Sequence, residues 1–177
     1  MRMMKLFSVI NFISFQLCWF TAATYKQEGL LIIGAILTFH FLLSPKKIAD
    51  IKVLSIALVG IFVDQILIIS QIIQLTQSSE QWSFIPLWLI FLWCSFAWCF
   101  NHSLHWLLKL ALPKVAVLGG VFGALSYYAA LRLEVFSSLV SPIYFALVML
   151  LVWSILLPIF VRMHSYVIKE NAIEKHV

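Results

Sequence analysis

Residues Val53–Leu75 read VLSIALVGIFVDQILIISQIIQL, an apolar run in which Asp64 is the single charged side chain. A run of about 20 apolar residues is long enough to cross a bilayer as a helix. A carboxylate at that depth is costly, and we expect it to have a structural or functional partner. The run therefore predicts a membrane-spanning helix and makes Asp64 the first candidate site residue.

The remainder of the chain has the same apolar character. Of its 177 residues, 63% are hydrophobic and 11% are charged, whereas a soluble domain has about 25% charged residues. The formal net charge of +5 would suit nucleic acid only if the cations formed a basic patch on a soluble fold. No more than two cations are adjacent in this sequence. We therefore expect a membrane protein with the lipid bilayer as its partner, and no binding of nucleic acid.

Window hydropathy and the breaks between apolar runs predict an all-α, polytopic integral membrane protein. One membrane domain, residues 1–161, is followed by a cytoplasmic tail at 162–177. The six expected transmembrane helices lie at 6–25, 29–45, 53–75, 84–105, 115–133 and 139–161.

The distribution of Lys and Arg predicts the orientation of these helices. With the N-terminus inside the cell, ten cations fall on the cytoplasmic side, and only Lys26 and Arg132 fall on the opposite side. Cytoplasmic loops of membrane proteins are enriched in Lys and Arg. Both termini are therefore expected in the cytoplasm.

The third predicted helix has a small and polar face. Ala57, Gly60, Asp64, Gln71 and Gln74 recur at spacings of three, four and seven, which place them together on a helix. This face should turn inward, toward other helices or a wet cavity. Two interpretations stay open: Asp64 is a buried anchor that locks helix packing, or it is a proton or ligand site.

Polar residues of other helices are expected between the midplane and the cytoplasmic side. Asn11 and Gln16 lie on the first helix, and Asn101 and His102 lie near the inner end of the fourth. Together with Asp64, these residues predict a polar pocket that is open to the cytoplasm and has Asp64 as its floor.

A metal site is not expected in this pocket. His102 and His105 are three residues apart, a spacing that suits two ligands on one helix. The other histidines, however, are scattered singly along the chain, so the ligand set is incomplete. We predict no metal and no cofactor.

The fifth predicted helix combines close packing with polar groups in its outer half. Gly119 and Gly123 form a small-xxx-small pair, which favours close helix contact. Tyr127, Tyr128 and Arg132 follow toward the outer end, where Arg132 could pair with a nearby acidic side chain or an anionic head group. All three are candidate pocket residues.

Four motifs in this order resemble a family of small bacterial inner-membrane proteins, the domain-of-unknown-function family 2878. They are NFISFQLCWF from Asn11, GIFVDQ around Asp64, NHSLHW from Asn101, and LSYYAALRL from Leu125. The resemblance covers nearly the whole chain and implies a multi-pass protein of the bacterial inner membrane, without implying an activity. The residues that it singles out are Asn11, Gln16, Trp19, Asp64, Asn101, His102, Ser103, Tyr127, Tyr128 and Arg132.

The expected function is a non-catalytic membrane subunit or a module that binds a lipid or small molecule in an inward-facing polar pocket. Its partner would be a membrane lipid or another membrane subunit. The alternative is a lipid-modifying membrane enzyme that uses Asp64 and His102 as acid and base groups. A third hypothesis is a small carrier or transporter subunit.

Overall fold

The computed structural model describes residues 2–77, 80–81 and 84–174, and helices form most of it. The long helices are α1 (Arg2–Tyr25), α2 (Leu30–Leu43), α4 (Leu54–Ile69), α5 (Leu87–Cys99), α6 (Leu112–Arg132) and α7 (Pro142–Glu174). The short elements are η1 (Lys26–Gly29), α3 (Lys47–Lys52), η2 (His105–Lys109) and an antiparallel pair of two-residue strands, β1 (Thr76–Gln77) and β2 (Glu80–Gln81). The prediction of an all-α protein is confirmed.

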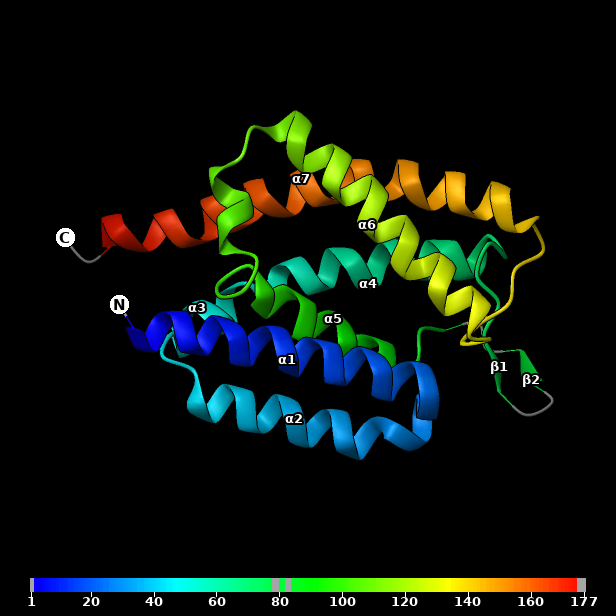
Figure 1. Ribbon diagram of the computed structural model, residues 1–177, viewed down its shortest axis with the longest axis horizontal. Coiled ribbons are helices and arrows are strands. Elements are labelled where there is room, and N and C mark those ends of the chain that lie inside the picture. The colour runs from blue at the N-terminus through cyan, green and yellow to red at the C-terminus, as the bar shows by residue number, and fades with distance from the viewer. Residues whose placement is uncertain (1, 78–79, 82–83, 175–177) are drawn as a thin grey trace.

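Helix α5 lies at the centre of the bundle. It packs against α1, α2 and α4, and many of its side chains are buried between them. Helices α6 and α7 form an antiparallel pair, and α7 contacts α3, α4 and η2 of the rest of the bundle. Figure 1 shows the long helices running roughly along the long axis, with both ends of the chain at the same end of the bundle.

Four helical stretches are long and apolar enough to cross a membrane. They are Met4–Leu43, Lys47–Ile69, Leu112–Arg132 and Pro142–Ile168. The first stretch contains two helices, because the chain reverses at η1 and α2 returns beside α1 (Figure 1). Helix α5 is also apolar but has only 13 residues. Four stretches therefore fit a membrane by length and composition.

Three helix ends differ most from the expected boundaries, and one of them is the end of α5, which stops at Cys99 rather than near residue 105. Helix α4 stops at Ile69 rather than near residue 75, because Gln71 adopts a left-handed backbone with φ of 60°. Gln71 and Gln74 consequently lie in a loop instead of on the predicted helix face. Helix α7 is not broken at Pro158. It continues beyond residue 161 into the predicted tail, as far as Glu174. Of that tail, residues 175–177 lie outside the described residues.

Helix α6 ends in a hydrogen-bonded cap. Glu134 adopts φ of 55°, and its N–H bonds to the carbonyl of Leu131 while the N–H of Val135 bonds to that of Ala130. This pair of bonds is the Schellman motif, which satisfies carbonyls at a helix C-terminus. The motif turns the chain toward α7, and buried Val135 closes the end of the helix pair.

The glycines of α6 allow α7 to approach closely, as the sequence predicted. A Cβ atom on Gly119 would lie 2.5 Å from the carbonyl oxygen of Trp153, and one on Gly123 would lie 2.1 Å from the Trp153 ring. Both distances are far below normal carbon contacts of about 3.5–4.0 Å. The two glycines therefore position Trp153 against α6.

Candidate functional site

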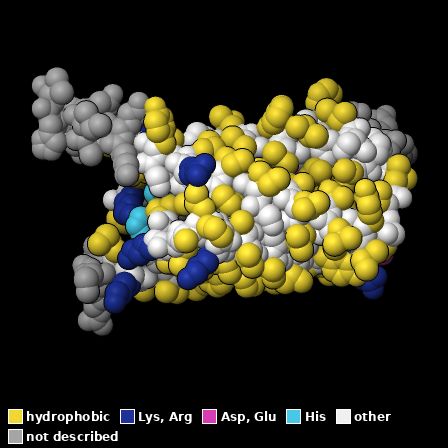
Figure 2. All heavy atoms as spheres, turned by 90° about the horizontal axis from the view of Figure 1, so that it is seen from above, with side chains coloured by type: hydrophobic (Ala, Val, Ile, Leu, Met, Phe, Trp, Pro, Cys, Tyr) yellow, Lys and Arg dark blue, Asp and Glu magenta, His cyan; other side chains and the backbone are white. Residues whose placement is uncertain are grey.

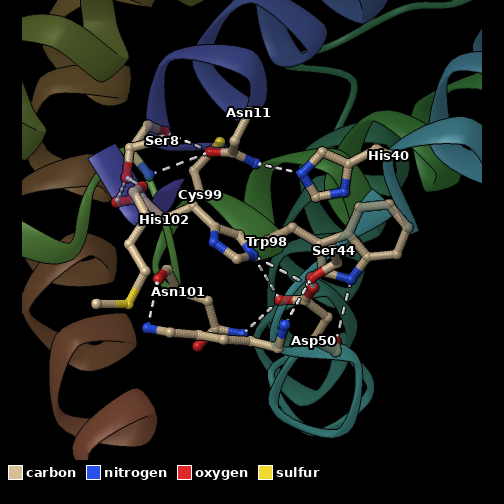
Figure 3. Close-up of polar contacts among 12 residues, drawn as sticks. Ser8, Asn11, His40, Ser44, Asp50, Trp98, Cys99, Asn101 and His102 are labelled. Atoms are coloured by element: carbon tan, nitrogen blue, oxygen red, sulfur yellow. Dashed lines mark hydrogen bonds and ion pairs between the residues drawn. The ribbon is translucent and has the colours of Figure 1, made fainter. Parts of the chain in front are cut away.

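The first polar site is centred on Asp50, which lies on the short helix α3 and is fully buried. Its carboxylate accepts hydrogen bonds from His102 Nε2 at 3.0 Å, from Asn101 Nδ2 at 2.7 Å and from the Ser44 hydroxyl. Its backbone carbonyl accepts a bond from Trp98 Nε1 at 3.0 Å. Figure 3 shows His102, Asn101 and Ser44 converging on the Asp50 carboxylate. Within the described part of the chain, Asp50 and His102 are the one pair of acidic and basic side chains within salt-bridge distance.

Helix α7 reaches this carboxylate through Asn101. Because Asn101 Nδ2 donates to Asp50, its Oδ1 atom is the acceptor that faces His164 Nε2 at 2.8 Å. Lys46 adds a bond from its Nζ atom to the Asn101 backbone carbonyl at 3.2 Å. A residue of the predicted cytoplasmic tail, His164, is therefore part of a buried network.

Helices α1 and α2 join the same region through Asn11. Its Oδ1 atom accepts bonds from the backbone N–H and the hydroxyl of Ser103, the latter at 2.6 Å. Its Nδ2 atom therefore donates to His40 Nε2 at 3.0 Å. The His40 ring stacks on Trp98 with centroids 4.9 Å apart. We call the whole set of residues the Asp50 cluster: Asn11, His40, Ser44, Asp50, Trp98, Asn101, His102, Ser103 and His164.

The Asp50 cluster ties together the helix ends on the side of the bundle that carries both chain ends. Its members come from α1, α2, α3, α5, α7, the turn between α2 and α3, and the segment that follows α5. Among the described residues, no group of three or more His, Cys, Asp and Glu could hold a metal ion. A buried, well-partnered carboxylate of this kind fixes the relative positions of the helices.

Asp64 forms a second, separate polar site. It lies on α4 with 1% of its surface exposed. Trp93 Nε1 from α5 donates to its Oδ2 atom at 2.7 Å, and the Tyr127 hydroxyl from α6 donates to its Oδ1 atom at 2.6 Å. Gly60, one turn earlier on α4, leaves room for the Trp93 ring, because a Cβ atom there would lie 2.3 Å from it.

A cavity of about 570 Å³ lies between α1 and α6, and Asp64 contributes to its wall. Helices α5 and α7, η2 and the loops after α4, α5 and α6 form the rest of the wall, largely with aromatic and aliphatic side chains. Exposed rings of Phe12, Phe20 and Phe122 mark its mouth between the two helices. Trp19 on α1 donates to the Ser126 hydroxyl on α6 at 3.1 Å, which closes the cavity on one side. We call this space the α1/α6 cavity.

The structure divides the eight predicted pocket residues among different places. Asn11, Asn101 and His102 belong to the Asp50 cluster, while Gln16, Asp64 and Tyr127 line the α1/α6 cavity. Tyr128 is half-buried and Arg132 is exposed, and neither lines the cavity. The single pocket expected from the sequence is thus two sites, which approach each other at Ser103, a cluster residue that also lines the cavity.

The second histidine of the NHSLHW motif stands apart from the Asp50 carboxylate. His105 is exposed, and its ring centroid lies 6.0 Å from that of His164. Partial burial and the positive charge of Lys46 lower the pKa of the His105 imidazole. Both effects favour the neutral form of the His105 imidazole beside His164.

Sequence reasoning missed several residues that make these sites. Asp50 and Ser44 lie in a stretch with three lysines, which reads as a solvated loop, and His164 lies in the predicted tail. Trp93 reads as one aromatic residue among many. A signal for His164 was present, since Phe160, His164 and Ile168 continue the helical spacing of the last apolar run.

Comparison with known families identifies the chain. The family described as "Protein of unknown function (DUF2878)" matches residues 8–159. The chain belongs to this family. The DUF2878 match runs from α1 into α7, so it covers Asp50, Asp64 and the α1/α6 cavity but ends before His164. No curated protein and no solved structure matches the chain.

Proposed function

We propose that the protein is a six-span integral membrane protein of the bacterial inner membrane that binds a hydrophobic or amphipathic small molecule in the α1/α6 cavity. The observation that carries the proposal is the cavity itself. Ligand pockets have volumes of about 300–1,000 Å³ and combine an apolar wall with a few polar groups. A cavity of about 570 Å³ with Gln16, Asp64, Ser126 and Tyr127 in an otherwise largely apolar wall fits this description.

The outer surface supports a membrane location. Large hydrophobic side chains such as Leu31, Phe62 and Ile143 are more than half exposed. Figure 2 shows hydrophobic side chains over the body of the molecule, with most of the visible Lys and Arg near one end. This end carries both ends of the chain in Figure 1. An even number of spans with cytoplasmic termini agrees with that arrangement and with the excess of cations on one side.

The position of the cavity mouth supports entry from the lipid phase. The exposed rings of Phe12, Phe20 and Phe122 lie within α1 and α6, and a fourth exposed lining ring, that of Trp106, lies on η2. A hydrophobic molecule could enter between these helices without crossing water. The binding proposal is favoured over an enzyme that pairs Asp64 with His102, because these two residues contact different partners in different sites.

The proposal is tested with a neutral hydrophobic probe. N-phenyl-1-naphthylamine should become more fluorescent on binding to the purified protein in detergent micelles. It is excited at its own absorption band and not through energy transfer from tryptophan. Leu118→Trp places a bulkier side chain in the cavity wall and should weaken probe affinity about tenfold, or about 1.4 kcal/mol. Val117→Trp is the matched control, because Val117 is 65% exposed and does not line the cavity. Equal probe binding by all three proteins would overturn the proposal.

The six-span arrangement has its own test. Reporter fusions at Gln81 and at the C-terminus should report a periplasmic and a cytoplasmic location, respectively. A periplasmic C-terminus would overturn the proposed number of spans.

A further inference from the structure

Asp64 is the one charged side chain among the described residues that line the α1/α6 cavity. Trp93 donates to one carboxylate oxygen and Tyr127 to the other. An indole N–H can only donate, and an ionised carboxylate can accept about four hydrogen bonds. Both donors are neutral groups, so the described residues supply no counter-ion within salt-bridge distance of Asp64. When it is ionised, Asp64 therefore gives the cavity a negative charge with acceptor capacity left over.

The wall around this charge is rich in aromatic rings. Trp93 stacks on Trp153 with ring centroids 5.8 Å apart, and the Tyr127 ring lies 5.9 Å from that of Trp153. The faces of aromatic rings attract cations, and tryptophan attracts them most strongly. The carboxylate and the rings beside it thus favour the same sign of ligand charge.

We infer that the ligand of the α1/α6 cavity is a lipophilic cation, an apolar molecule that carries an ammonium or phosphonium group. The inference rests on the proposed function, because it names the ligand class of the same cavity. The positive group lies beside Asp64 and the aromatic pair, and the apolar part fills the space toward the mouth. Asp64 offsets the cost of moving the cation from water into an apolar space.

The charge preference can be measured with two ions of nearly the same size and opposite charge. Tetraphenylphosphonium and tetraphenylborate each compete with N-phenyl-1-naphthylamine for the purified protein in a non-ionic detergent. The phosphonium should displace the probe at a concentration at least about tenfold lower than the borate. The wild-type protein alone gives this comparison, so it does not depend on the folding of any variant.

Two variants then assign the preference to Asp64. Asp64→Asn keeps the shape of the side chain but removes its charge, and it should weaken phosphonium binding about tenfold more than it weakens binding of the neutral probe. Asp64→Glu keeps the charge and should retain at least part of the preference. Each variant is first checked for probe binding, which reports an intact cavity.

The outcomes separate this inference from the proposed function. If the neutral probe binds but the two ions compete equally, the ligand is not selected by charge and the inference is overturned, while the binding function stands. Loss of the preference in Asp64→Asn supports the inference, and its persistence there overturns it. If neither probe nor ions bind the wild-type protein, both proposals are overturned.

Discussion

Asp50 and Asp64 are both buried acids, with 0% and 1% of their surfaces exposed, yet their surroundings differ. Asp50 accepts bonds from three side chains, and one of them, His102, can carry a positive charge. Asp64 accepts bonds from two neutral groups and faces a cavity. The difference follows from position, because Asp50 lies at the end of the bundle, where a short helix and the segment after α5 can supply partners.

This comparison indicates different roles for the two carboxylates. A buried charge with a full set of partners holds structure together, and removing it leaves its donors unsatisfied. A buried acid without a counter-ion is by default a candidate for a functional site. Asp50 therefore belongs to the framework of the helix ends, whereas Asp64 belongs to the cavity.

Removing the Asp50 carboxylate should have the largest effect on stability. Asp50→Ala leaves His102, Asn101 and Ser44 buried without their acceptor, and breaking such a buried pair costs about 3–5 kcal/mol. Asp64→Ala should cost less, about 1–3 kcal/mol, because it orphans two neutral donors. The free energy of unfolding of each purified variant, measured by denaturant titration in mixed micelles, gives the ranking.

The control for this ranking lies on the same short helix. Lys47 is exposed on α3, and Lys47→Ala should change the free energy of unfolding by no more than about 0.5 kcal/mol. If Asp64→Ala destabilises the protein more than Asp50→Ala, the assignment of Asp50 to the framework is wrong.

The contrast between the two acids also explains why the burial of one could be predicted from the sequence and the burial of the other could not. Asp64 stands alone in a long apolar run, and its spacing from Ala57 and Gly60 predicts a buried face, which the burial of all three residues confirms. Asp50 stands among lysines in a short segment. Its burial depends on Asn101 and His102, about fifty residues later, which no local pattern reveals.

The fold, too, could be predicted from the sequence only in part. Apolar runs predict the long helices because a run of that length needs internal backbone hydrogen bonds in a membrane. The early end of α4 depends on the backbone conformation of Gln71, for which the sequence offers no glycine or proline as a signal. The division of the predicted pocket into two sites depends on how α5 lies between α1 and α4, and this is a property of packing.

A substitution at the position where α4 packs beside the Asp64 site should cause an intermediate loss of stability. A Cβ atom on Gly60 would lie 2.3 Å from the Trp93 ring, so Gly60→Ala forces this indole to move away from Asp64. Overpacking of this kind costs about 1–3 kcal/mol. The variant should also bind tetraphenylphosphonium more weakly, as probe displacement would show.

Gly34→Ala is the matched control for that substitution. Its Cβ atom would meet only Phe91 at 3.5 Å, which is an ordinary contact. Alanine is favoured over glycine inside a helix by up to about 1 kcal/mol, so this variant should be unchanged or slightly more stable. If Gly34→Ala destabilises the protein as much as Gly60→Ala does, the contact with Trp93 is not the cause of the loss of stability in Gly60→Ala.

The smallest effect should come from the second hydrogen bond to Asp64. Tyr127→Phe removes the hydroxyl that lies 2.6 Å from Oδ1 but leaves the bond from Trp93, so it should cost about 1 kcal/mol. Tyr128→Phe makes the same chemical change one residue later, at a half-buried position that does not line the cavity, and should cost less than about 0.5 kcal/mol. Unfolding free energies of both variants isolate the contribution of the Asp64 contact, because the two substitutions remove identical atoms. Equal losses would mean that Tyr127 acts through its ring and that Asp64 is held by Trp93 alone.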